Sequence, residues 1–303
     1  MDQKNNGGIR NPKSETRNRI CFLSTDSLEG YVSDDELAIP ALHDFGWTVE
    51  TVSWRDQKID WNDFEAVIIR TPWDYQRAPE EFLRVLERIE RSSARLANPL
   101  ETVQWNLSKT YLRELEEKGA PIVPTVWGNF PIDERVFDRW LEDFGAEEII
   151  VKPTISATAE DTYRLRDFWP ELTEIFRDRP FMVQPFMKNI VAEGEFSLFY
   201  FGGELSHAIL KTPKPKDFRV QEEFGGIITA IDPEKKLLEA GDRIFNFIEP
   251  TPLYARVDLV RDASADEFLL MELELIEPAL YFRMNREAPR RFAGRFNEWM
   301  NEL

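Results

Sequence analysis

Short apolar segments alternate with amphipathic ones over the first third of the chain. The apolar segments are β-rich and bounded by polar residues, and they are residues 19–24, 47–52, 64–70 and 94–99. Amphipathic helices are predicted between them, one within residues 33–46 and one that begins at Pro79. Pro40 predicts a kink in the first helix or a delayed start. This alternation predicts a small parallel α/β domain over residues 18–114.

The pattern changes in the middle of the chain, where strands and helices no longer alternate regularly. Residues 105–119 form a predicted helix that ends in Gly119. The predicted elements that follow are strands at residues 122–127 and 148–153, helices at residues 131–145 and 167–178, and one further short strand. Together they indicate a small α+β lobe over residues 115–182.

Longer strands pair as hairpins from residue 183 onward. The predicted strands are residues 196–201, 204–211, 253–260 and 267–276, and the predicted helices are residues 233–248 and 286–302. Gly202 and Gly203 separate the first two strands and are a strong hairpin signal. The simplest architecture for residues 183–303 is therefore an antiparallel sheet with helices on one side.

The charge of the chain narrows what it can bind. It has 303 residues, with 56 acidic and 38 basic side chains and a formal net charge of −18 at pH 7. Nucleic acids and anionic membranes are repelled by such a field, and no uncharged stretch approaches the roughly 18 residues of a membrane helix. A polyanionic ligand would therefore need a local group of cations.

Cysteine and histidine are scarce, which limits the available chemistry. Cys21 is the single cysteine, so an internal disulfide is excluded and a reducing compartment is favoured. Two histidines, His43 and His207, leave little room for a histidine-based triad or a zinc site. Residues 1–17 lack the apolar core of a signal peptide and are predicted as a disordered tail. These features predict a cytoplasmic protein whose chemistry rests on carboxylates, lysines and arginines.

The last hairpin carries the sharpest chemical signal. Strand side chains alternate, so Glu272 and Glu274 share one face, whereas Met271 and the leucines at positions 273 and 275 occupy the other. A turn centred near Ala265 places Asp258 opposite Glu272. Like charges in this arrangement destabilise a sheet, and a hard cation such as Mg²⁺ would relieve the conflict.

Two other interpretations of this hairpin stay open. One is a solvated acidic face balanced by Arg256, on the same side of the sheet. A Ca²⁺-binding structural domain would also explain the acids. It would leave the basic residues at positions 109, 152 and 219 without a common purpose.

Separated basic residues form the second signal. Lys152 ends an apolar strand, Lys109 opens a helix, Lys211 ends a hairpin strand, and Arg219 precedes a glycine pair. Each of them alone is more often structural, because lysine stems snorkel at strand ends. In combination with an acidic metal site they favour phosphate chemistry. With bound Mg²⁺ they would make a positive pocket inside a negative protein.

The order and spacing of these motifs resemble the ATP-grasp superfamily, in particular prokaryotic glutathione synthetase and the O-ureidoserine cyclo-ligase of cycloserine biosynthesis. The resemblance implies an ATP-grasp fold, with a Rossmann-like parallel N-terminal domain, a small central lid lobe and a mostly antiparallel C-terminal sheet. It implies ATP and Mg²⁺ as cofactors, with Mn²⁺ as an alternative. The implied partners are small-molecule carboxylate and amine substrates, without nucleic acid or membrane, and a homodimer stays open.

The resemblance also implies roles for single residues. The implied nucleotide-binding residues are Lys109 in WNLSKTYL, Lys152 in IIVKP, Ser156 in the lid loop, Gln184 and Phe186 through backbone hydrogen bonds to adenine, and Glu195 facing the ribose. The implied phosphate-side catalytic residues are Lys211 and Arg219, and the implied metal ligands are Asp258, Glu272 and Glu274. The chain departs from the pattern at residues 156–159, where relatives commonly carry glycines, and at Ser197, where glutathione synthetase carries an arginine.

The implied reaction is an ADP-forming carboxylate–amine ligation through an acylphosphate, on an amino-acid or peptide-like substrate. Intramolecular cyclisation of the O-ureidoserine type is one alternative. A non-catalytic nucleotide-binding protein is another, because the lid loop is poor in glycine. Arg70, Thr71 and Asp74 follow a buried parallel strand, where α/β sheets bind ligands, and are hypothesised to face the substrate; helix capping is the favoured alternative role for them.

Overall fold

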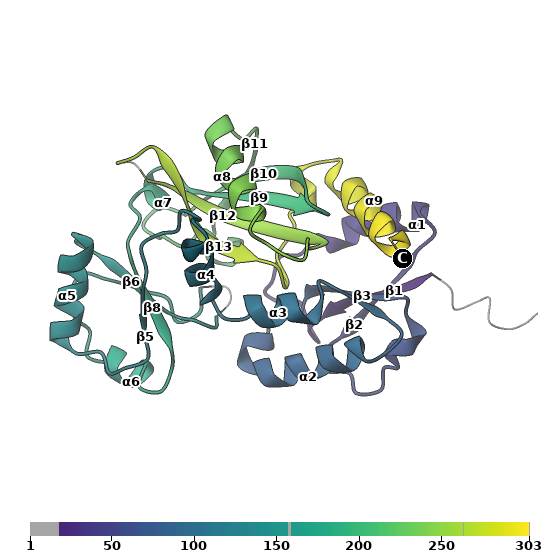
Figure 1. Cartoon of the computed structure of the whole chain (residues 1–303), viewed down its shortest axis with the longest axis horizontal. Coiled ribbons are helices and arrows are strands. Elements are labelled where there is room, and N and C mark those ends of the chain that lie inside the picture. The colour runs from purple at the N-terminus through teal and green to yellow at the C-terminus, as the bar shows by residue number, and fades with distance from the viewer. Residues whose placement is uncertain (1–17, 157–158, 263, 303) are drawn as a thin grey trace, which may run out of the picture.

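Three sheets organise the computed structural model, each formed by one stretch of the chain (Figure 1). The structure describes residues 18–156, 159–262 and 264–302. The predicted disordered tail, residues 1–17, lies outside these ranges. None of the helices in the described ranges is both long and apolar enough to cross a lipid bilayer.

The first sheet is parallel, with the strand order β2-β1-β3-β4. Its strands are β1 (Arg19–Ser24), β2 (Thr48–Ser53), β3 (Ala66–Thr71) and β4 (Arg95–Ala97), and its helices are α1 (Ile39–Asp44), α2 (Pro79–Glu90) and α3 (Leu100–Asn106). The predicted parallel α/β arrangement is confirmed. Pro40 lies in the first turn of α1, after a 3₁₀ turn, so the helix begins late, as the proline predicts.

The second sheet is antiparallel and has the strand order β5-β8-β6-β7. Its strands are β5 (Val126–Gly128), β6 (Ile149–Pro153), β7 (Tyr163–Leu165) and β8 (Phe181–Pro185), and its helices are α5 (Glu134–Phe144) and α6 (Leu172–Ile175). Helix α4 (Tyr111–Glu117) precedes β5 in the chain but packs in the core of the third sheet. The strand predicted at 122–127 begins later, at Val126 of β5, because Ile122 makes a single bridge, to Leu270, and Pro124 lacks the N–H that a ladder needs. The predicted helix at 167–178 is reduced to the single turn of α6.

The predicted helix 105–119 is broken between α3 and α4. The Lys109 N–H donates to the Thr154 carbonyl at 2.8 Å instead of continuing the helix. Asn106, the last residue of α3, donates to the Leu273 carbonyl and accepts from the Leu275 N–H, both at 2.9 Å. The break therefore fixes Lys109 between the central sheet and the last strand of the chain.

The third sheet is antiparallel, with the strand order β11-β10-β9-β12-β13. Its strands are β9 (Glu195–Phe201), β10 (Glu204–Thr212), β11 (Ile227–Ile231), β12 (Tyr254–Asp262) and β13 (Glu267–Glu274), and its helices are α7 (Asn189–Ala192), α8 (Lys235–Phe245) and α9 (Ala288–Asn301). Both predicted hairpins are confirmed, whereas β11 is not among the predicted strands.

Helices cover both faces of the third sheet, which corrects the prediction that they lie on one side. Residues of α8 pack with Leu198 and Tyr200 of β9, whereas residues of α9 pack with Phe199 and Phe201. Alternate strand residues point to opposite faces. The helices therefore lie on opposite sides of the sheet, and a one-sided arrangement would leave one of these two apolar faces in water.

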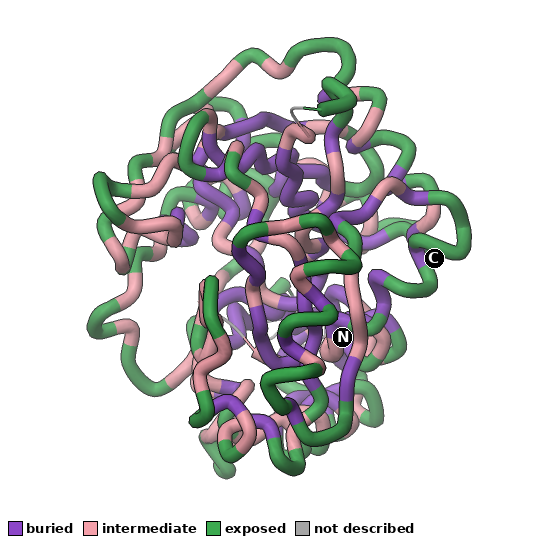
Figure 2. The backbone as a smooth tube through the Cα atoms, turned by 90° about the vertical axis from the view of Figure 1, so that its left-hand side faces the viewer, coloured by how far each residue is buried: buried purple, intermediate pink, exposed green. Residues whose placement is uncertain are grey.

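Shared cores join the lobes. One apolar cluster combines Phe22 and Ile68 of the first sheet with Phe199 and Phe201 of the third, and Figure 2 shows buried backbone in the interior with exposed loops at the rim. The central sheet has a core of its own, centred on Phe137 and Phe181. The first and third sheets thus share one packed core, whereas the central sheet has a separate core.

His207 in β10 predicts a pH dependence of stability. Its ring stacks on Phe199 with centroids 4.2 Å apart, and its Nε2 donates to the Leu280 carbonyl at 3.0 Å, so Nε2 carries the proton of the neutral ring. Burial lowers the pKa of His207 to about 4, against the weaker raising effect of the Leu280 carbonyl. The unfolded chain binds this proton first, so stability is lost as the pH falls from about 6.5 toward 4.

We expect this group to make the free energy of unfolding about 2 kcal/mol lower at pH 5 than at pH 7. Urea titrations of the wild type and of His207→Gln at both pH values measure this contribution as the difference between their pH dependences. His43→Gln is the matched control, because that ring is exposed on α1. Identical pH dependences for the wild type and His207→Gln would contradict the prediction.

Candidate active site

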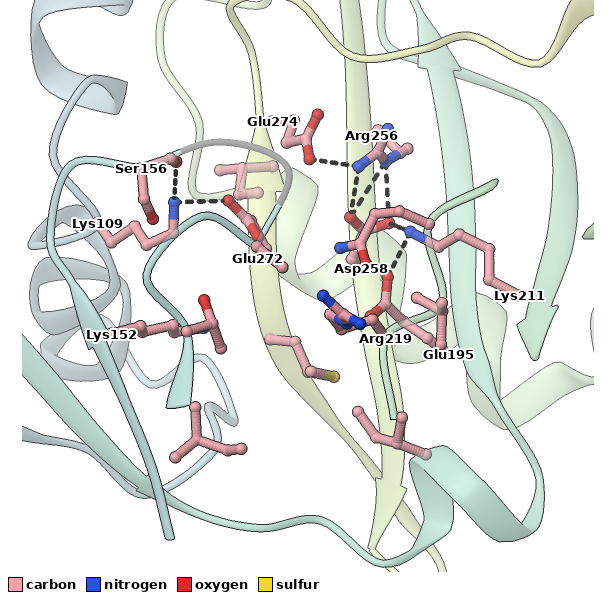
Figure 3. A pocket seen from close by; sticks show the side chains of 18 of the residues that line it. Lys109, Lys152, Ser156, Glu195, Lys211, Arg219, Arg256, Asp258, Glu272 and Glu274 are labelled. Atoms are coloured by element: carbon pink, nitrogen blue, oxygen red, sulfur yellow. Dashed lines mark hydrogen bonds and ion pairs between the residues drawn. The ribbon is translucent and has the colours of Figure 1, made fainter. Parts of the chain in front are cut away.

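A single cavity is lined by all eleven predicted site residues, which come from the central and third sheets and from the break between α3 and α4. Figure 3 shows lysines, arginines and carboxylates that face one another across it. Side chains from the loop after β3 complete the lining. The residues that the sequence singled out therefore lie together, although they span 166 positions from Lys109 to Glu274.

The acidic hairpin has the predicted strand pairing, and Arg256, the alternative partner predicted for its acids, also contacts them. Asp258 lies opposite Glu272, and Arg256 lies opposite Glu274. The Arg256 guanidinium donates to Asp258 from Nε at 3.0 Å and from Nη2 at 2.9 Å, and it also pairs with Glu274 (Figure 3). Within the described residues, no three acidic, histidine or cysteine side chains converge closely enough to hold a metal ion. The carboxylates are instead balanced by cations of the chain.

A β-bulge changes which face one residue of β13 occupies. Asp258 pairs with Glu272, but the next residue of β12, Leu259, pairs with Leu270, so Met271 is the extra residue. Leu270 and Leu273 consequently both enter the core, and Met271 lines the cavity beside Glu272. The prediction that Met271 lies on the face opposite Glu272 is wrong, because strict alternation fails at a bulge.

The donor set of the hairpin suits a hard cation even though it is now paired with arginine and lysine. Burial raises the pKa of Glu274 to about 8, the Arg256 charge opposes this rise, and the neighbouring carboxylates of Glu272 and Asp258 add to it. Burial raises the pKa of Asp258, but Arg256 and Lys211 lower it more, to about 2. The paired Arg256 therefore does not fully offset the burial of Glu274, and carboxylate oxygens are the ligands that Mg²⁺ prefers.

Two of the predicted phosphate-binding lysines are already engaged. Lys211 is buried and its Nζ pairs with Glu195 and, at 3.2 Å, with Asp258. Burial lowers the pKa of Lys211, but these two carboxylates raise it more. Lys109 Nζ lies 2.9 Å from Glu272 Oε1 and donates to the Ser156 carbonyl at 2.8 Å. Residues 157 and 158, which continue the predicted lid loop after Ser156, lie outside the described ranges.

Lys152 differs from the other lysines of the cavity. It is buried at the end of β6, and none of the described carboxylates lies within 4.0 Å of its Nζ. Burial lowers the pKa of Lys152, with the distant charge of Glu272 acting in the opposite direction. An incompletely compensated buried ammonium is costly, so Lys152 is the cation of the cavity that is most available to an anionic ligand.

Arg219 lies on the loop between β10 and β11 and is held by a neighbour. Its Nε and Nη2 donate to the two oxygens of Asp217 at 3.1 and 3.0 Å, and its guanidinium lies 3.8 Å from the ring centroid of Phe224. The Arg219 hydrogen bonds are the largest cause of a lowered pKa at Asp217. The Asp217 carboxylate and the Phe224 ring thus orient the arginine toward the cavity.

The cations do not make a positive pocket by themselves. Five cationic side chains and six carboxylates line the cavity, and most of them are paired across it. The predicted positive pocket therefore depends on the bound Mg²⁺ that the prediction includes. Three of the lining carboxylates belong to the hairpin, and these are the groups that a bound Mg²⁺ would contact.

The end of β8 provides main-chain groups to the cavity. Gln184 is buried, and its Nε2 donates to Thr125 Oγ1 at 2.9 Å. The Phe186 N–H donates to the Glu148 carbonyl at 2.9 Å, so this N–H is not free to contact adenine. Met187, the next residue, also lines the cavity. The sequence alone does not show which backbone groups of this segment are free, because that is set by the register of β8 against β6.

Arg70, Thr71 and Asp74 do not reach the cavity, so the hypothesis that they face the substrate does not hold. Arg70 is fully buried and Thr71 donates to a serine of β1. Trp73 and Tyr75 of the same loop line the cavity instead. Glu277 also lines it and was missed by sequence reasoning, since its only signal is its position three residues after Glu274.

A parallel N-terminal sheet, a small antiparallel lobe and a larger antiparallel sheet make up the ATP-grasp fold. Solved structures agree on this fold. An ATP-grasp RimK domain protein from Sphaerobacter thermophilus gives a TM-score of 0.65 at 14% identity, covering 93% of this chain and 99% of that one. The ATP-grasp ligase PsnB, complexed with its minimal precursor, Mg and ADP, gives 0.62 at 13% identity, covering 93% and 98%.

More specific likeness comes from proteins of cycloserine biosynthesis. Residues 20–98 match the family model described as the N-terminal domain of D-cycloserine synthetase DcsG. The cycloserine biosynthesis protein DcsG of Streptomyces lavendulae is 30% identical over 290 residues, which are 90% of this chain and 96% of that protein. The crystal structure of D-cycloserine synthetase DcsG gives a TM-score of 0.80 at 27% identity, covering 93% and 99%. The chain belongs to the ATP-grasp superfamily and, within it, to the family of DcsG.

Proposed function

We propose that this chain is an ATP- and Mg²⁺-dependent ligase that closes a C–N bond within one small substrate. The observation that carries the proposal is the likeness to the Streptomyces lavendulae protein over nearly the whole of both chains. In the reaction, a substrate carboxylate oxygen takes the terminal phosphoryl group of ATP and ADP leaves. A nitrogen of the same molecule then forms the C–N bond and displaces phosphate. Joining two separate substrates is the alternative.

Lys152 and Lys109 are the residues that would bind the phosphates. Lys152 Nζ has no close carboxylate partner among the described residues, and Lys109 Nζ lies between Glu272 and the Ser156 carbonyl at the start of the lid loop. Both act as point charges on phosphate oxygens. Glu195, paired with Lys211, is the proposed ribose contact.

Main-chain groups after β8 would bind adenine. Alternate backbone groups of an extended strand point to opposite edges. Because the Phe186 N–H bonds to β6, the Pro185 carbonyl and the Met187 N–H are the groups that we propose for the adenine edge. The Gln184 side chain, held by Thr125, would support this segment from the opposite side.

Glu272, Glu274 and Asp258 are the residues that would hold Mg²⁺. When bound, the metal neutralises charge on the phosphates. Arg219, oriented by Asp217, would stabilise the transferring phosphoryl group and the acylphosphate through paired N–H donors. Lys211 and Arg256 act on Asp258 rather than on substrate and are positioning residues. The chemistry is mainly orientation and electrostatics, which agrees with the scarcity of cysteine and histidine.

The test is ADP release with Mg²⁺ and O-ureidoserine as the single substrate, without any added amine. We expect turnover that stops when Mg²⁺ is removed by a chelator. ADP release that requires an added amine, in a panel of amino acids and dipeptides, would favour the two-substrate alternative. Nucleotide binding without ADP release on any member of the panel would identify a non-catalytic nucleotide-binding protein.

A further inference from the structure

Glu277 is a cavity carboxylate without a cationic partner. It follows β13 and lines the same cavity as the hairpin acids. Of the other carboxylates there, the four paired with a lysine or arginine within 4.0 Å are Glu195, Asp258, Glu272 and Glu274. For Glu277, no lysine or arginine in the described ranges lies within that distance. A partly buried carboxylate in such a position is expected to bind a cation from outside the chain.

Aromatic side chains hold Glu277 in place. Trp73 Nε1 donates to the Glu277 carbonyl at 2.9 Å, and the Tyr75 hydroxyl faces its carboxylate. Both rings are buried in the lining of the cavity, and Tyr31 packs on Trp73 with centroids 5.4 Å apart. Aromatic rings beside a carboxylate are the surroundings that bind ammonium groups in proteins.

The position of Glu277 assigns it to the substrate end of the cavity. Trp73 and Tyr75 follow β3, at the carboxyl edge of the parallel sheet, where α/β folds bind ligands. The proposed adenine groups lie at the end of β8, in the central sheet. Glu272 and Glu274 precede Glu277 on the same segment of chain, and all three line the same cavity.

We propose that Glu277, Trp73 and Tyr75 form a subsite for an ammonium group of the substrate. This subsite would hold the free, cationic amino group of the substrate while its carboxylate is activated. This inference rests on the proposed function, because it takes the cavity as the site of ligation. Burial raises the pKa of Glu277 to about 7, as expected for a carboxylate that awaits a cation, although the Tyr75 hydrogen bond lowers it.

Isothermal titration calorimetry of the full chain, loaded with Mg²⁺ and the ATP analogue AMP-PNP, tests this subsite. The probes are D- and L-O-ureidoserine, each with a free amino group and as the N-acetyl derivative. We expect the preferred free amine to bind about 30-fold more tightly than its N-acetyl form, as a charge-assisted hydrogen bond implies. Glu277→Gln should weaken binding of the free amine by a similar factor and leave the N-acetyl form within about threefold.

Glu267→Gln is the matched control, because this glutamate opens β13 and is exposed. It should bind both forms as the wild type does. Equal binding of the free and acetylated forms by the wild type, equal weakening of both in Glu277→Gln, or no binding of any free amine would overturn the subsite. If Glu277→Gln does not fold, the comparison of the two forms on the wild type decides alone.

The same titration separates this inference from the function on which it rests. AMP-PNP and Mg²⁺ should bind to the wild type and to Glu277→Gln with equal affinity, because Glu277 is not a proposed nucleotide residue. A wild type that does not bind AMP-PNP would contradict the proposed function. Nucleotide binding without discrimination between free and acetylated amines would overturn the subsite alone.

Discussion

Lys152→Met should reduce kcat/KM for ADP release by about 10³-fold, because it removes a positioned cation from the transferring phosphate. The same variant should unfold at an equal or higher free energy than the wild type. Lys152 is buried and no described carboxylate lies within 4.0 Å of its Nζ, and burial lowers its pKa. The folded state therefore loses little when the charge is removed.

Steady-state ADP release and urea unfolding, measured on one preparation, test both parts of this prediction. Lys235→Met is the control, since this lysine is exposed on α8 and pairs only with Glu239 of the same helix at 3.3 Å. It should change neither quantity. A Lys152→Met protein that is strongly destabilised would show a structural role for this lysine, and full activity would remove it from the phosphate site.

Lys211→Met should affect stability rather than phosphate binding, in contrast to Lys152→Met. We expect a loss of about 3–5 kcal/mol in the free energy of unfolding. Its Nζ pairs with Glu195 and Asp258, and all three side chains are buried. Removing the ammonium group leaves the buried Glu195 carboxylate without a cationic partner among the described residues, and leaves Asp258 with Arg256 alone. Any loss of activity in this variant should follow from the loss of folded protein and from displaced acids.

A double variant distinguishes this explanation from a simple packing defect. Glu195→Gln in the Lys211→Met background removes the carboxylate that has no other lysine or arginine within 4.0 Å in the described ranges, so it should recover about 1–2 kcal/mol of the loss. Urea unfolding of the two single variants and the double variant at pH 7 measures the coupling. Additive losses would contradict a charge-pair origin.

The local sequence pattern predicted the strand pairing of the acidic hairpin correctly but not the bulge within it. The pairing of Asp258 with Glu272 follows from strand length and turn position, which are local properties. The bulge at Met271 is set by packing of Leu270 and Leu273 against α8 and is not visible in the hairpin sequence. The balancing of the acidic face by Arg256 is confirmed, whereas metal binding by the same acids stays a prediction.

Residues set by contacts between lobes were the ones that sequence reasoning missed. Lys109 was found by motif, but the break that carries it depends on a hydrogen bond to Thr154, 45 positions away. The choice between Phe186 and Met187 depends on the register of β6 against β8. Glu277 lies outside any strand, and only the aromatic loop after β3 gives it a place in the cavity.

The near balance of five cations and six carboxylates in the cavity has a kinetic consequence. A cavity with so little net charge does not attract a nucleotide by long-range electrostatics. The chain as a whole, with a net charge of −18, repels the nucleotide. Association then depends on diffusion and on exchange of ion pairs at short range. Added salt screens the repulsion, so nucleotide should arrive faster as ionic strength rises, the reverse of an enzyme that steers its anionic substrate inward.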